Sequence, residues 1–297
     1  MNIVVTGCSG FVGIPLCREL TERGHRVFGV ARNKIDNLDK IIDADNFSFY
    51  KADITHSKSL KNVFIHNQID CVIHLAAYIP KGKHSYRQCA IVNYEGVFNL
   101  LEMVRIYGVP NLIFASTQMV YSRKSDSPIM ESISLRPDTF YGLSKKQGEE
   151  LFEYYALNHN VHTFILRFSG IYGKGKETGV VQNFINQALL GQDLIINQKN
   201  KIKDIVYIKD AVKLTINALE NIENTSFATV NAGGTSISLY HLAKKIISLT
   251  GSCSNAIIKN EKLMEDFQLS MNKAKNMFRH RPMKVDDCLA EMINLMR

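Results

Sequence analysis

A tyrosine and a lysine one helical turn apart are the first residues of this chain that could do chemistry. Tyr141 and Lys145 begin the predicted helix 140–158, in the run YGLSK. Side chains at positions i and i+4 lie on one helix face, and a nearby ammonium group lowers the pKa of a tyrosine from its usual value of about 10. The pair predicts a tyrosine that exchanges a proton with a hydroxyl or ketone near neutral pH. The same spacing alone would also suit an exposed helix surface.

Polar side chains of other predicted elements could complete such a site. Thr117 follows the predicted strand 111–116, where its hydroxyl could bind the same substrate oxygen as Tyr141. Asn93 lies within the predicted helix 89–107 and could hold a water or a backbone group near the lysine. A capping threonine and a solvated helix face are the alternatives for these two residues.

Three glycines near the N-terminus have the spacing of a phosphate-binding turn. Gly7, Gly10 and Gly13 follow a short β-branched run and precede an apolar, helix-like segment. In such a unit the first glycine permits the turn, the second lets the backbone approach a pyrophosphate, and the third lets the helix pack closely on the strand. The first N–H groups of the helix and its dipole then hold the phosphate charge. An ordinary glycine-rich turn is the alternative.

Alternating predicted strands and helices must position these residues. After the first strand, further strands are predicted over 26–30, 47–52, 70–75, 111–116 and 162–167, the last ending on Arg167, a candidate substrate ligand. Helices are predicted over 33–46, 60–67 with Ser57 as the N-cap, 89–107 and 140–158. This alternation predicts an α/β fold with a doubly wound parallel sheet that binds ligands at the carboxyl ends of its strands.

The last third of the chain is less regular. A glycine-containing loop is predicted over 170–179, a strand over 227–231, and helices over 180–190, 210–221, 238–250 and 286–296. These elements predict a smaller, mixed domain that covers the substrate.

Composition limits the class of protein. The chain has 297 residues, 45% of them hydrophobic, which suffices for one large domain or two unequal ones. The net charge of +8 is spread along the chain, which favours a basic surface, or a field that attracts small anions, over a nucleic-acid-binding face.

Six cysteines without a Cys-x-x-Cys pair indicate reduced thiols. Nine histidines without ligand spacing predict no metal. No run is long enough to span a membrane and Met1 directly precedes the first strand, so we expect a cytoplasmic protein.

The chain resembles the extended short-chain dehydrogenase/reductases, specifically the NAD-dependent epimerase/dehydratase family of nucleotide-sugar enzymes. The matching motifs occur in the family's order over nearly the whole chain: Thr6-Gly7-x-x-Gly10-x-x-Gly13, Asp53, His74-Leu75-Ala76-Ala77, Asn93-x-x-Gly96, Ser116-Thr117, Tyr141-x-x-x-Lys145, the stretch from Lys203 to Ala211, and Asn231-Ala232-Gly233-Gly234. The resemblance implies a Rossmann sheet and a bound dinucleotide.

The resemblance also implies roles for individual residues. Tyr141 would be the acid/base, Lys145 its tuning cation and ribose anchor, and Thr117 the partner of the substrate oxygen. Arg167 and Lys203 would bind substrate. The implied cofactor ligands are Gly7, Gly10, Phe11, Val12 and Gly13 at the pyrophosphate, Arg32, Asp53 and Ile54 at the adenosine, Leu75, Ala76 and Ala77 at the nicotinamide-side ribose, and Asn93, Tyr141 and Lys145.

Departures from the family pattern bear on the reaction. Gln118 and Met119 replace the Asp-Glu pair of the family's dehydratases, so 4,6-dehydration is not expected. Ala31 replaces the acid that binds the adenosine ribose and Arg32 follows it, which favours NADP(H) over NAD(H). An ordinary solvated arginine is the alternative. Gly170 replaces an asparagine that often touches the nucleotide phosphate.

These features favour hydride transfer at a keto or carbinol carbon, C4, of a nucleotide-activated sugar. An NADPH-dependent 4-keto reductase is the leading interpretation. An NAD-dependent nucleotide-sugar 4-epimerase is the rival within the family, and a non-catalytic dinucleotide sensor is the rival of another class. A sensor needs no acid/base, so Thr117, Tyr141 and Lys145 count against it.

The sequence also predicts two domains and a dimer. We expect an NAD(P)-binding domain over 1–168, joined again by 203–231, and a substrate domain over 169–202 and 232–297. Helices 89–107 and 140–158 carry apolar residues on more than one face, and relatives of this kind commonly dimerise through these two helices. We therefore expect a homodimer; the apolar residues that suggest it are Leu100, Leu101, Val104, Leu151, Phe152 and Tyr155. A thick core within one chain is the alternative.

Overall fold

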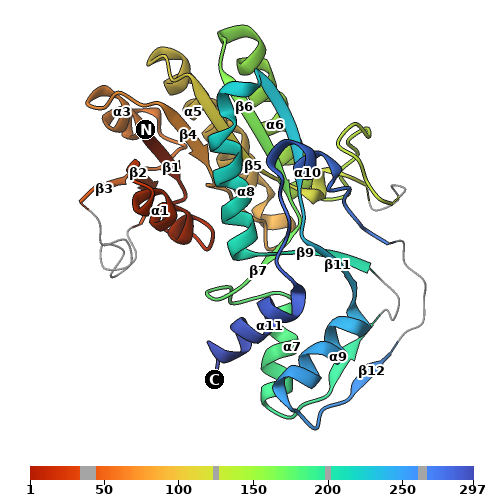
Figure 1. Cartoon of the computed structure of the whole chain (residues 1–297). Helices are drawn as coiled ribbons and strands as arrows, with labels where there is room; N and C mark the ends of the chain where they lie inside the picture. The colour runs from red at the N-terminus through yellow and green to blue at the C-terminus, as the bar shows by residue number, and fades with distance from the viewer. Residues whose placement is uncertain (34–44, 123–126, 198–201, 260–265) are drawn as a thin grey trace. The chain divides into compact units, whose positions relative to one another are not determined.

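The computed structural model describes residues 1–33, 45–122, 127–197, 202–259 and 266–297. The chain forms two compact units, each built from several segments (Figure 1). Unit 1 comprises Met1–Ser122, Ser134–Arg167 and Val212–Val230, and unit 2 comprises Arg123–Ile133, Phe168–Ala211 and Asn231–Arg297.

A seven-stranded sheet forms the centre of unit 1, in the order β10-β6-β5-β4-β1-β2-β3. Its strands are β1 (Asn2–Thr6), β2 (Arg26–Ala31), β3 (Phe47–Lys51), β4 (Cys71–His74), β5 (Asn111–Thr117), β6 (His162–Phe168) and β10 (Phe227–Ala232), whose last residues belong to unit 2. The pairs β1–β2, β1–β4, β2–β3 and β4–β5 are parallel. The predicted doubly wound parallel sheet is confirmed.

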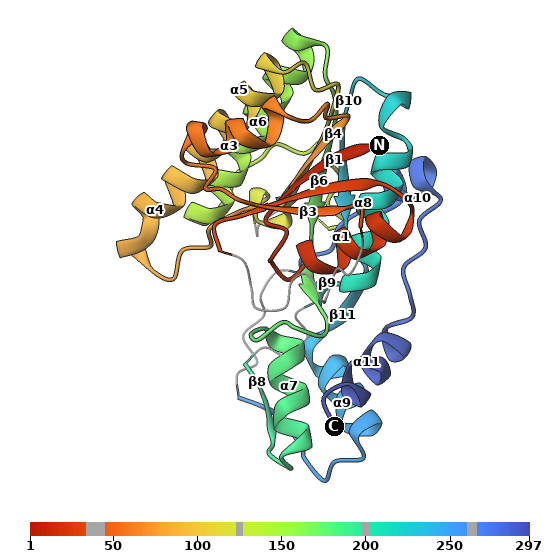
Figure 2. The same cartoon turned by 90° about the vertical axis from the view of Figure 1, so that its left-hand side faces the viewer.

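Helices cover both faces of this sheet. Figure 2 shows α3 (Ser57–Ile65), α5 (Gly96–Ile106) and α6 (Phe140–His159) on one side, and α1 (Gly13–Glu22) and α8 (Ile208–Glu220) on the other. All four residues of β4 are buried. Strands of a parallel sheet that is covered on both faces are nearly continuous apolar runs, which is why the sequence indicated them.

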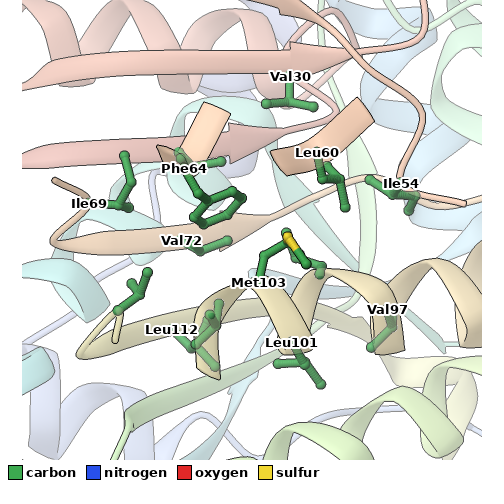
Figure 3. Packing of buried hydrophobic residues seen from close by; sticks show 14 of the residues in the cluster. Val30, Ile54, Leu60, Phe64, Ile69, Val72, Val97, Leu101, Met103 and Leu112 are labelled. Carbon is green, nitrogen blue, oxygen red and sulfur yellow. The ribbon is translucent and has the colours of Figure 1, made fainter. Parts of the chain in front are cut away.

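A single apolar cluster fixes the helices on the first of these faces. Leu60 and Phe64 of α3 and Leu101 of α5 pack with Val72 of β4 and Leu112 of β5 (Figure 3). The same cluster contains most of the residues expected at a dimer contact, namely Leu100, Leu101, Val104, Phe152 and Tyr155. For these residues the alternative holds, because they pack in a thick core within one chain. The homodimer itself stays a prediction.

Unit 2 is smaller and mixed. Its three-stranded sheet pairs β9 (Ile202–Tyr207) antiparallel with β11 (Thr235–Ser238) and parallel with β7 (Gly170–Tyr172). Strands β8 (Leu194–Ile196) and β12 (Ala256–Ile258) form a parallel pair. Its helices are α7 (Val180–Leu189), α9 (Leu239–Thr250), α10 (Asn272–Phe278) and α11 (Val285–Asn294).

Some local predictions need correction. The predicted helix 33–46 falls mostly outside the described residues. Ser57 is the first residue of α3, and His56 occupies the N-cap without a side-chain capping bond. The long helix predicted over 89–107 is interrupted: α4 (Tyr86–Ala90) runs into a π-helical turn at Ile91–Glu95 before α5 begins. In the described part of the chain, no helix is both long and apolar enough to cross a membrane.

Candidate active site

The glycine turn has the geometry that its spacing predicts. Gly7 has φ +75°, which favours glycine, and a Cβ on Gly13 would overlap the Gly7 carbonyl. Gly10 donates its N–H to the Gly7 carbonyl at 2.9 Å. Phe11 and Val12 complete the turn, and no side chain of the described residues caps the N-terminus of α1 at Val12. Such a helix start is suited to anions, so these residues fit the pyrophosphate of a dinucleotide.

The carboxyl end of β2 lies beside this turn. The Gly7 N–H donates to the Val30 carbonyl at 2.8 Å. Ala31 ends the strand and Arg32 follows it as an exposed residue. An exposed guanidinium can bind a phosphate. The adjacent residues 34–44 lie outside the described part of the chain.

The segment after β3 is held by its own side chains. The Asp53 carboxylate accepts from the N–H of Thr55 at 2.9 Å and from its hydroxyl at 2.8 Å. Ile54 is 5% exposed and touches the start of α5, where a Cβ on Gly96 would lie 2.7 Å from its side chain. The segment expected at the adenine is thus held by local contacts.

The segment after β4 also contacts the glycine turn. The N–H of Leu75 donates to the Thr6 carbonyl at 3.1 Å, and the N–H of Ala76 donates to the Thr6 hydroxyl at 3.4 Å. A Cβ on Gly7 would lie 2.8 Å from the Ala76 nitrogen. Leu75 and Ala76 are half-buried, whereas Ala77 is exposed. The structure therefore brings this expected cofactor segment next to the expected pyrophosphate turn.

Asn93 connects the loop after β4 to the helix of Tyr141. Its side chain accepts from the N–H of Tyr78 at 2.7 Å and donates to the Tyr78 carbonyl at 2.9 Å. It also donates to the Ser144 hydroxyl at 3.0 Å, and Ser144 donates to the Tyr141 carbonyl at 2.8 Å. Asn93 thus holds a backbone segment, one of the two roles expected for it. Sequence reasoning missed Ser144, although it directly precedes Lys145.

The start of α6 places Tyr141 against the end of β5. The Thr139 hydroxyl caps the helix by accepting from the Gly142 N–H at 3.0 Å. A Cβ on Gly142 would overlap the carbonyl of Met119, so α6 directly abuts the 3₁₀ turn Gln118–Val120.

Thr117 ends β5 immediately before that turn. Its hydroxyl accepts from the Met119 N–H at 3.3 Å, and α6 packs on both β5 and the turn. Tyr141, Lys145 and Thr117 are therefore carried by adjoining elements of one unit. The Gln118 Oε1 atom, in the same turn, is buried and has no hydrogen-bond partner among the described residues.

The side chain of Lys145 is buried. It is 2% exposed, and its Nζ lies 4.1 Å from the ring centroid of Phe114. Burial lowers the lysine pKa to about 7, while the charges of Glu149 and Cys89 act in the opposite direction. The protonation state of Lys145 therefore depends on its surroundings near neutral pH.

The tyrosine differs from the sequence-based expectation. Burial, with a smaller effect of Cys89, raises the pKa of Tyr141 above its usual value. The expected phenolate is therefore not favoured by the chain alone, because burial disfavours the charged form of the phenol. The expectation also included the nicotinamide cation, which is not part of the chain.

Arg167 lies in a buried polar network. Its Nε and Nη2 donate to the two oxygens of Glu149, at 3.0 and 2.7 Å, and its Nη1 donates to the Tyr121 hydroxyl at 2.8 Å. The Ser116 hydroxyl donates to the same Glu149 carboxylate. With a 5% exposed arginine, this arrangement gives Arg167 a structural role, and its contact with substrate stays a prediction. Glu149 was visible in the sequence as the position i+4 from Lys145.

Lys203 lies in unit 2, in β9, and is half-buried. The neighbouring Asp204 carboxylate accepts from the backbone N–H groups of Gly234 at 3.0 Å and Leu269 at 3.2 Å. No group of three or more histidine, cysteine, aspartate or glutamate side chains in the described residues could hold a metal ion.

Comparisons with known proteins agree with this geometry. The model of the NAD dependent epimerase/dehydratase family matches residues 3–233. Two similar proteins are a putative UDP-glucose 4-epimerase of Methanocaldococcus jannaschii, 32% identical over 226 residues (73% of this chain and 73% of that protein), and a dTDP-4-dehydro-6-deoxyglucose reductase of Escherichia coli, 30% identical over 264 residues (82% and 80%).

Similar folds occur among solved structures. The UDP-glucose 4-epimerase of Thermotoga maritima, determined with UDP-glucose, has a TM-score of 0.88 and 26% identity, and the match covers 100% of this chain and 99% of that one. The family match covers most of the chain, including the glycine turn and the Tyr141–Lys145 helix. The chain is thus an enzyme of the extended short-chain dehydrogenase type and belongs to the NAD dependent epimerase/dehydratase family.

Proposed function

We propose that this protein interconverts the C4 configuration of a nucleotide-activated sugar, as an NAD(P)-dependent 4-epimerase. The observation that carries the proposal is the placement of Tyr141 and Lys145 at the start of α6, against the turn that follows Thr117. The glycine turn belongs to the same unit. The names of the similar proteins support C4 chemistry on nucleotide sugars.

In this proposal the dinucleotide, when bound, takes up and returns a hydride. Gly7, Gly10 and Gly13 with the start of α1 hold its pyrophosphate. Unit 1 thus binds the cofactor. Lys203 is a proposed partner for a phosphate of the sugar nucleotide.

The chain's own side chains move the proton. Tyr141 removes a proton from the sugar hydroxyl as the carbinol is oxidised, and returns it when the carbonyl is reduced. Lys145, as a cation, favours the phenolate required for the first step. Thr117 donates a hydrogen bond to the same substrate oxygen and holds it near Tyr141.

A 4-keto reductase is the second candidate, and one observation favours it. Ala31 and the exposed Arg32 follow β2 in the place where a ribose-binding acid would select NAD(H). NADP(H) selectivity suits a net reduction with an exchanging cofactor, whereas an epimerase regenerates its dinucleotide in each turnover.

Two measurements separate these candidates. The first is the identity of any dinucleotide released when the purified protein is denatured; retained NAD favours the epimerase. The second is turnover of UDP-glucose and UDP-galactose without added cofactor, compared with NADPH oxidation in the presence of a nucleotide 4-keto sugar. Failure of both reactions, with no dinucleotide binding, would contradict the proposed function.

We also propose a homodimer, with a contact different from the one first expected. Large apolar side chains are exposed on α6 and on the turn-and-helix segment leading into and through α5. They include Tyr94 and Phe98 (43% and 46% exposed), and Tyr154 and Leu157 (57% and 68%). A second copy of the chain could cover this surface, since oligomers commonly bury such faces by two-fold symmetry.

A further inference from the structure

A buried ion pair lies one helical turn beyond the lysine of the active site. Glu149 follows Lys145 by four residues on α6 and is 4% exposed. Its carboxylate is bound by the guanidinium of Arg167 from β6, with the closest contact at 2.7 Å. Both members are almost fully removed from water, where a charge is costly unless it is paired.

The pair also holds both ends of the segment that carries Thr117. Ser116, directly before it, donates its hydroxyl to Glu149. Tyr121, directly after the 3₁₀ turn, accepts from Arg167 at 2.8 Å, and the guanidinium carbon lies 5.0 Å from its ring centroid. One ion pair therefore joins α6, β6 and the two ends of this segment.

Glu149, held by Arg167, supplies a negative charge near Lys145. Lys145 has no ion pair within 4.0 Å among the described residues, and it lies over an apolar ring. The titratable groups near it are Tyr141 and Glu149 on its own helix, Cys89 of α4, His74 of β4, and Arg167 of β6 behind Glu149. Of these, Glu149 is a carboxylate on the same helix face.

We propose that Glu149, oriented by Arg167, is a positioning residue that keeps Lys145 cationic in the working enzyme. Arg167 fixes the orientation of the Glu149 carboxylate, and the negative charge of Glu149 favours the ammonium form of Lys145. The buried pair would thereby act on the proton chemistry of Tyr141 without touching substrate or cofactor. The proposal rests on the proposed role of Lys145.

The test is the titration of Lys145 in protein labelled with ¹³C at the lysine Cε carbon. The resonance is assigned by its loss in Lys145→Gln, and the titration needs neither substrate nor cofactor. In Glu149→Gln we expect the titration midpoint to fall by about one pH unit or more, because a nearby opposite charge is removed. Glu150→Gln is the matched control, because Glu150 is the next residue on α6, is 60% exposed and pairs with Lys146. It should leave the midpoint unchanged.

A double variant keeps the test informative where Glu149→Gln alone does not fold. Glu149→Gln with Arg167→Met removes both charges and leaves none unpaired. Its midpoint should lie below that of the wild type and above that of the single variant. A midpoint equal to the wild-type value in every folded variant would overturn the proposal and leave the pair a purely structural one.

Activity gives a separate readout. If the enzyme turns over a nucleotide sugar, the loss of kcat at high pH should begin at lower pH in Glu149→Gln, by the same interval as the lysine midpoint. Absence of turnover in the wild type would contradict the proposed function, while the lysine titration would still decide the role of Glu149.

Discussion

Thr6 and His74 face one another on the parallel strands β1 and β4, with the threonine Oγ1 atom 2.7 Å from the histidine Nδ1 atom. His74 is completely buried and stacks on Phe114 and Phe152. Burial, and then the charge of Lys145, hold its pKa well below 6.5. The imidazole is therefore neutral in the folded protein.

This neutral histidine should make stability depend on pH. The unfolded chain binds a proton at His74 below about pH 6.5 while the folded chain does not, so the free energy of unfolding should decrease as pH falls from 6.5 toward 5, by up to about 1.4 kcal/mol per pH unit. Urea unfolding of the wild type and His74→Gln should show a shallower slope in the variant. His66→Gln, at an exposed position, should keep the wild-type slope, and equal slopes in all three proteins would contradict the prediction.

Removal of the Tyr141 hydroxyl should abolish most of the activity. In Tyr141→Phe we expect kcat to fall about a hundredfold or more, because the group that exchanges the proton is lost, with dinucleotide affinity nearly unchanged. Steady-state kinetics and cofactor titration measure the two effects. Tyr154→Phe makes the same change on an exposed face of the same helix and should remain active. Wild-type kcat in Tyr141→Phe would remove this residue from the mechanism.

Cofactor choice should depend on Arg32. Arg32→Ala should weaken NADP(H) binding about tenfold to a hundredfold, as for loss of a charge-assisted hydrogen bond to a phosphate, and change NAD(H) binding little. Calorimetric titration with both cofactors measures this. Arg26→Ala is the control, since Arg26 is exposed at the opposite end of the same strand. Tighter binding of NAD(H) than NADP(H) to the wild type would refute the NADP(H) preference and favour the epimerase.

The exposed face of α5 should decide the oligomeric state. Phe98→Glu places a charge at a 46% exposed position, and we expect it to convert a dimer into a folded monomer because the contact would bury a charge without a partner. Leu101→Glu, inside the core, should instead destabilise the fold. Light scattering at micromolar concentration and thermal unfolding distinguish these results. A monomeric wild type would rule out the dimer, and a dimeric Phe98→Glu would move its contact elsewhere.

Local patterns predicted the sheet and the catalytic helix well, for definite reasons. β4 is a continuous apolar run, and the glycines of the first turn have a fixed spacing, so short windows of sequence contain the signal. The helix that carries Tyr141 and Lys145 was predicted, and a single helical turn relates the two residues.

Relationships between distant segments could not be found in this way. Glu149 and Arg167 meet through the packing of α6 on β6, and no local pattern indicates that the arginine turns into the protein and not toward a ligand. β9 was missed because Lys203 and Asp204 interrupt its apolar residues; its strand identity comes from pairing with β7 and β11. The raised pKa of Tyr141 likewise reflects burial, which depends on the whole fold.

The order of the strands has a consequence for synthesis on the ribosome. β10 lies at the edge of the large sheet beside β6, although the chain between them passes through α7, β8 and β9. As the nascent chain emerges from its N-terminus, six strands of the sheet are available before the seventh has been made. Until then β6 is an open edge with unpaired backbone groups, which other chains could bind. A ribosome that pauses between residues 168 and 227 would thus lengthen the time for which this edge of the sheet stays open.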